Sequence, residues 1–178
     1  DDGSVANVSG AIAADATWTA AGGPYLVSAP LTITSGATLT IEPGASIYLG
    51  PGVGLTVAPG GRLLAEGTEA RPNHFTRAPG ATANGGTVTI NGAAGAPESR
   101  FRHVFFNFGG SPAVVCAANS NVILDHCEWL RTDAAYLHLD GGSFVVSNCI
   151  FPTAAANSYF EASHGKGATR GGISDKAV

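Results

Sequence analysis

The sequence predicts an all-β fold, a right-handed parallel β-helix (β-solenoid) with about 16–24 residues per coil. Short apolar fragments recur every eight residues over 31–65, and a second pattern recurs every 22–23 residues over 101–151. The chain also has 25 glycines and only 12% charged residues, a composition that suits short strands and tight turns better than helices.

The first repeat set consists of apolar residues spaced eight apart, each followed two positions later by another apolar residue. They are Leu31, Leu39, Ile47, Leu55 and Leu63. This alternation predicts strands with one buried face. Pro-Gly pairs at 43–44 and 59–60 predict corners, because proline fixes φ and glycine tolerates positive φ. The spacing leaves two coil shapes open, a two-sided coil of sixteen residues or a triangle with eight-residue sides.

The second repeat set comprises the segments 101–106, 124–129 and 146–151. Each reads apolar, polar, His or Asn, small apolar, any residue, aromatic. Stacking of successive coils then predicts three interior ladders: Phe101–Leu124–Val146, Val104–Cys127–Cys149 and Phe106–Trp129–Phe151. The first apolar residue and the small apolar residue of each segment lie three positions apart, whereas a continuous strand would place them two apart. A corner is therefore expected between them, at Arg102-His103, Asp125-His126 and Ser147-Asn148.

Three parts of the chain are expected: an N-terminal cap at 1–16, the parallel β-helix at 17–164, and a frayed or truncated glycine-rich tail at 165–178. A solenoid interrupted within its array exposes an unpaired strand edge. The sequence therefore predicts self-association through an uncapped C-terminal coil.

Composition excludes several classes of function. The net charge of −4 and the lack of a basic run argue against nucleic-acid binding, and no apolar run is long enough to span a membrane. Cys116, Cys127 and Cys149 are odd in number and match no zinc-site spacing, so we interpret them as buried thiols. No metal and no cofactor is predicted.

Residues 18–27 (WTAAGGPYLV), residues 37–44 (ATLTIEPG) and the Asn-Cys-x-Phe rung at 148–151 resemble secreted bacterial β-helix proteins of the pectin-lyase-like superfamily. In many of these proteins the β-helix lies beside lamin-tail-type and spore-coat-kinase-type domains. The resemblance covers roughly residues 17–152 and implies a secreted, extracellular protein. It implies no single activity, because the superfamily contains lyases, hydrolases, adhesins and inert scaffolds.

Among relatives of this kind, lyases use an exposed Lys or Arg base, often with Ca²⁺, and hydrolases use paired Asp residues with a Gly-His-Gly loop. The nearest fragment here, around His164, lacks the preceding glycine, and no Asp pair stands upstream in the core. We therefore interpret His164 as an ordinary loop residue and name no catalytic residue. Lys166, Arg170 and Lys176 are expected to solubilise the tail, or to meet an acidic glycan if further coils exist.

The densest polar cluster is Asp125, His126 and Glu128, with Arg131 and Asp133 close behind. We interpret it first as a bend followed by a solvated strand face. The alternative is a binding or acid/base patch.

Aromatic and threonine residues offer two further hypotheses. Trp129 falls in an interior ladder, whereas Tyr48 should point outward and could contact a glycan. Trp18, Tyr25 and Tyr136 remain as further candidates. The Thr-x-Thr fragments at 32–34, 38–40 and 87–89 would suit ice binding only if they were stacked in register, and outward threonine is also the ordinary polar residue of a strand.

The leading hypothesis is a non-catalytic extracellular scaffold or binding module that contacts carbohydrate or a neighbouring domain. The first alternative is a fragment of a polysaccharide lyase or glycoside hydrolase, and the second is an ice-binding solenoid.

Overall fold

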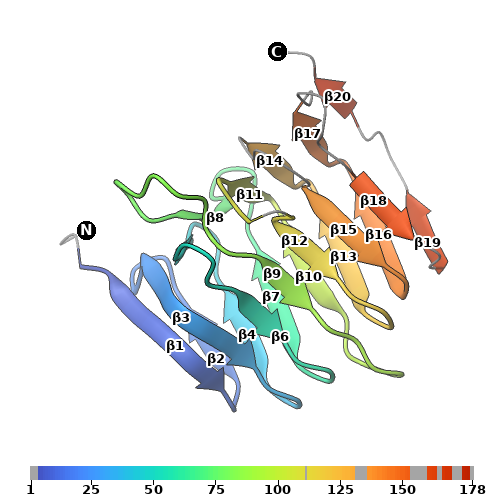
Figure 1. Ribbon diagram of the computed structural model, residues 1–178, viewed down its shortest axis with the longest axis horizontal. Coiled ribbons are helices and arrows are strands. Elements are labelled where there is room, and N and C mark those ends of the chain that lie inside the picture. Colours follow the sequence, from blue (N-terminus) through green and yellow to red (C-terminus); the bar gives the residue numbers. More distant parts are fainter. Residues whose placement is uncertain are drawn as a thin grey trace.

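The computed structural model describes residues 4–110, 112–130, 136–152, 160–163, 166–169 and 174–176, and every regular element in these ranges is a β-strand. The strands stack in parallel as a solenoid of about six turns, which confirms the predicted all-β solenoid. Figure 1 shows the strands following one another along the long axis, from β1 at one end to β20 at the other.

Each coil has three sides, and the strands on each side form one face of the solenoid. The first face contains β3 (Tyr25–Ile33, first part), β5 (Ser46–Leu49), β8 (Asn73–Arg77), β11 (Val104–Asn107), β14 (Glu128–Leu130), β17 (Ile150–Pro152) and β20 (Ser174–Lys176). The second face contains the last part of β3, β6 (Leu55–Val57), β9 (Val88–Ile90), β12 (Val114–Cys116), β15 (Leu137–Asp140) and β18 (Phe160–Ser163). The third face contains β2 (Ala16–Trp18), β4 (Thr38–Ile41), β7 (Arg62–Glu66), β10 (Ser99–Arg102), β13 (Asn121–Asp125), β16 (Ser143–Ser147) and β19 (Lys166–Thr169).

Strand pairing settles the coil shape that the eight-residue repeat left open. Leu31 pairs with Leu55, and Leu39 pairs with Leu63, in both cases 24 residues later. Three eight-residue sides therefore make one triangular coil over 31–65. One coil is much longer, since Leu64 pairs with Arg100 36 residues later. The connections at 78–87 and 91–98 lengthen it beyond the predicted range.

All three predicted ladders are present in the interior. Phe101 pairs with Leu124, and Leu124 with Val146, and all three side chains are fully buried. The other two ladders are buried as well. In the ladder of Phe106, Trp129 and Phe151 the rings stack from coil to coil, with the centroids of Trp129 and Phe151 4.5 Å apart. Phe75 extends this stack by one coil, on Phe106. The buried surface of each coil is thus covered by equivalent side chains of the next.

The cysteines are free and buried, as expected of core thiols. Burial raises the pKa of Cys116 to about 12, and it also raises the pKa of Cys127, because a thiolate is poorly solvated in the interior.

Strands also occur near both ends of the chain. In the region expected as a cap, β1 (Ala6–Ile12) pairs in parallel with both parts of β3, with a register shift between Val8 and Gly10. In the range expected as a tail, β19 pairs with β16 and β20 pairs with β17.

Candidate functional site

The corner between the third and first faces has the same backbone conformation in three successive coils. His103, His126 and Asn148 have φ values of 45°, 52° and 53°, in the left-handed region. This confirms the corners predicted at Arg102-His103, Asp125-His126 and Ser147-Asn148. Because one coil lies directly on the next, the imidazoles of His103 and His126 stack, with ring centroids 4.7 Å apart and planes 29° apart.

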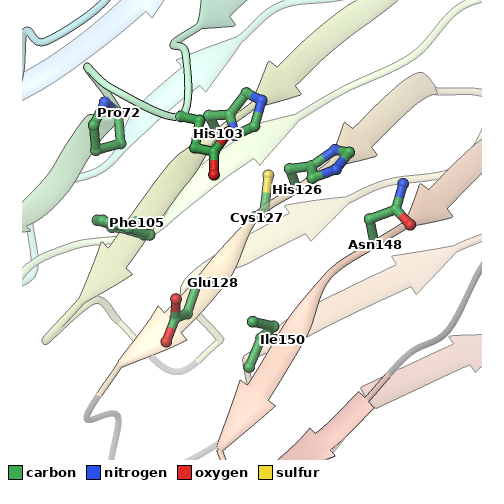
Figure 2. Close-up of a pocket in the computed structure, with 9 residues that line it drawn as sticks. Pro72, His103, Phe105, His126, Cys127, Glu128, Asn148 and Ile150 are labelled. Carbon is green, nitrogen blue, oxygen red and sulfur yellow. The ribbon is translucent and has the colours of Figure 1, made fainter.

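A groove of about 360 Å³ runs beside this corner over the outer side of the first face. Its lining residues are Glu69, Pro72, His103, Phe105, His126, Cys127, Glu128, Asn148 and Ile150. Figure 2 shows two rows of side chains, one along the corner and one formed by Phe105, Glu128 and Ile150. The second row arises because Phe105 pairs with Glu128, and Glu128 pairs with Ile150, on consecutive coils.

Asp125, the last residue of β13, organises the corner. Its Oδ1 accepts hydrogen bonds from Ser147 Oγ (2.8 Å) and Asn148 Nδ2 (3.0 Å), and it lies 3.0 Å from His126 Nδ1. The Nε atom of Arg102 lies 3.5 Å from Oδ2. The carboxylate therefore links three successive coils, through Arg102 on one side and Ser147 and Asn148 on the other.

The surroundings shift the titration of two corner groups. Burial alone would raise the pKa of Asp125, but hydrogen bonds from Asn148, Ser147 and His126 outweigh it and the net pKa is lowered. The pKa of His103 is lowered by burial, by His126 and by Arg102, against a smaller opposing effect of Asp125 and Glu69. The imidazole of His103 is therefore harder to protonate in the folded chain than a free imidazole.

A second hollow, of about 260 Å³, lies at the corner between the second and third faces. It is lined only by small or uncharged residues, among them Asn119, Asn121 and Ser143. It lacks the aromatic and ionisable groups of the groove, so we place the candidate site at the groove.

The structure brings part of the predicted polar cluster together. His126 and Glu128 line the groove, and Asp125 lies behind them at the corner. The predicted bend is therefore present, and two members of the cluster also face a concave surface. Several other candidates lie outside the described residues: Arg131, Asp133, His164 and Arg170. Lys166 and Lys176 lie on β19 and β20, where the side chains are not described.

The aromatic candidates separate by burial. Trp129 is fully buried as predicted, and Tyr48 lies on the outer side of β5, partly exposed. The other three candidates for an exposed platform are buried: Trp18, Tyr25 and Tyr136. Trp18 and Tyr25 instead stack on each other with centroids 4.5 Å apart.

The three Thr-x-Thr fragments are not stacked in register as pairs, although three threonines form a column on the second face and Thr17 pairs with Thr40 on the third. Thr32 pairs with Thr56, and Thr56 with Thr89, on the second face. By contrast, Thr38 pairs with Arg62, and the hydroxyl of Thr87 donates to the Pro112 carbonyl.

Sequence reasoning missed several groove residues, among them Glu69, His103 and Phe105. Glu69 sits in a tight turn closed by mutual backbone hydrogen bonds between Thr68 and Arg71, after the first repeat set ends and before the second begins. His103 was treated only as a corner, and Phe105 only as a variable position. The offset of 23 residues between His103 and His126, and between Phe105 and Glu128, was the signal that places them together.

Comparison with known proteins places the chain in no family: no family model, no curated protein and no solved structure matches it significantly. Within the described residues, no group of three or more His, Cys, Asp or Glu side chains could hold a metal ion. The same part of the chain has no helix long and apolar enough to cross a membrane.

Proposed function

We propose that this chain is a non-catalytic, extracellular binding module of the pectin-lyase-like type, and that its groove binds a saccharide chain. The observation that carries the proposal is the combination of Phe105 with ionisable polar side chains in one groove of about 360 Å³. Saccharides present apolar C–H faces, which pack on aromatic rings, and hydroxyl groups, which need hydrogen-bond partners. Concave sites of this size with a few polar groups are typical of small-ligand binding.

The lining residues divide these tasks. Phe105 is half-buried on the outer side of β11 and lies edge-on to His74, with ring centroids 5.3 Å apart. This contact limits the rotation of the Phe105 ring and presents a fixed apolar surface. Glu128, next to it on β14, offers carboxylate oxygens that accept hydrogen bonds from hydroxyl groups. With Glu69 also in the lining, the groove favours a neutral saccharide at neutral pH.

A glycan array followed by calorimetric titration of the best binder tests the proposal. Phe105→Ala should weaken binding roughly fivefold, because aromatic packing contributes about 1 kcal/mol. Val115→Ala is a matched control, since Val115 is also a half-buried, outward strand residue but lies on the second face. Binding to no saccharide, or equal affinity of the two variants, would refute the assignment of the groove.

Glycoside hydrolysis is a second candidate function, favoured by the presence of two carboxylates, Glu69 and Glu128, in one groove. Hydrolysis of this kind uses one carboxyl group as the acid and another as the base or nucleophile. In that case, Glu69→Gln and Glu128→Gln would each abolish the release of reducing ends while the saccharide still bound. If the unmodified chain releases no reducing ends from a saccharide that it binds, the non-catalytic proposal stands.

A further inference from the structure

The imidazoles of His103 and His126 form a pair because the same corner position is occupied in consecutive coils. Their ring centroids are 4.7 Å apart, and both residues line the groove. In the next coil the equivalent position is held by Asn148, with nearly the same backbone φ as His126. The chain therefore shows that this corner also accepts a side chain that cannot take up a proton.

Charged groups face this pair from four parts of the chain. Arg102 precedes His103 at its own corner, and Asp125 precedes His126 in the next coil. Glu69 faces the pair from the turn between β7 and β8 and acts on the charge of His103. Glu128 follows on β14, in the lining of the same groove. Asp125 is engaged by Arg102 and by three hydrogen-bonding groups, whereas the two glutamates face the groove.

Protonation of the pair changes the sign of the local charge. When both imidazoles are neutral, the ionised side chains in the groove lining are Glu69 and Glu128, which repel an anionic ligand. The two rings lie 4.7 Å apart, and burial together with the neighbouring His126 lowers the pKa of His103, so acidification adds positive charge to the groove lining against this repulsion. Each proton offsets one glutamate and adds a donor for a carboxylate.

We infer that the His103–His126 pair is a pH-dependent selector, which shifts the preference of the groove from neutral toward acidic saccharides as the pH falls. This inference rests on the proposed saccharide-binding function. It assigns to two corner residues a role in specificity that the packing of the solenoid does not require, since Asn148 supports the same corner without a titrating group.

The test compares a hexasaccharide of glucose with a hexasaccharide of galacturonic acid by calorimetric titration, at about pH 7.5 and about pH 5.0. The ratio of acidic to neutral affinity should rise roughly fivefold or more on acidification, the effect of one unit charge near a carboxylate in water. The matched variant is His103→Asn with His126→Asn, which copies the residue of the third coil. Its ratio should stay nearly constant, with a far-ultraviolet circular dichroism spectrum like that of the unmodified chain.

The possible outcomes separate the two proposals. A flat ratio in the unmodified chain, or a rise that persists in the double variant, overturns the selector and leaves saccharide binding intact. Binding to neither hexasaccharide at either pH overturns both. If the double variant loses its β-sheet spectrum, His126→Asn alone decides, and it should remove most of the rise.

Discussion

Replacing Leu124 by alanine tests whether equivalent side chains stacked between coils hold the solenoid together. Leu124 is fully buried and lies between Phe101 on one neighbouring coil and Val146 on the other. Leu-to-Ala changes in protein cores cost about 2–5 kcal/mol, and the larger values occur where surroundings cannot collapse into the cavity. Parallel backbone pairing fixes the coils on both sides of Leu124, so we expect a loss of about 3–5 kcal/mol.

Ile123→Ala provides the matched control. Ile123 is the preceding residue on β13 and is half-buried on the outer side of the strand, so its truncation should cost about 1 kcal/mol or less. Urea unfolding of both variants, followed by tryptophan fluorescence, gives the two free energies with the same denaturant dependence. Similar losses for the two variants, or a loss below about 1 kcal/mol for Leu124→Ala, would contradict the stacking argument.

Three further predictions concern the corner and the core. Asp125→Ala should lower the free energy of unfolding by about 1 kcal/mol in urea titrations, because Ser147 and Asn148 lose their acceptor at a solvent-accessible corner. An unchanged midpoint would contradict this. Because the pKa of His103 in the folded chain is lowered from 6.5, protonation favours the unfolded chain. The stability that this histidine contributes is therefore full above about pH 6.5 and is lost as the pH falls below it. On acidification, the urea midpoint of His103→Asn should fall less than the midpoint of the unmodified chain. The thiol of Cys116, with a pKa of about 12, should resist an aromatic disulfide reagent at about pH 8 in the native protein and react after denaturation, so rapid native labelling would contradict its burial.

The candidate site shows where sequence reasoning reaches its limit. The cluster of Asp125, His126 and Glu128 was visible because its members are neighbours in the chain. Glu69 was not, because it lies in a turn without repeat character and reaches the groove only after the chain has completed further coils. The groove is thus made by residues from four coils, and no local pattern reports such a surface.

The repeats by themselves determined the interior of this protein. Burial favours apolar residues at inward positions, so the 22- and 23-residue offsets indicated which side chains stack, and the three-residue spacing of apolar positions indicated the corners. Only the tertiary structure decided the coil shape over 31–65, because an eight-residue period fits both a two-sided and a three-sided coil. Hydrogen-bond register between Leu31 and Leu55 selects the triangle. In the later coils, strand pairing brings Phe105 beside Glu128, and the corner stacks His103 on His126. These side chains lie on the outer surface, where burial does not restrict the residue type, so the sequence pattern does not reveal them.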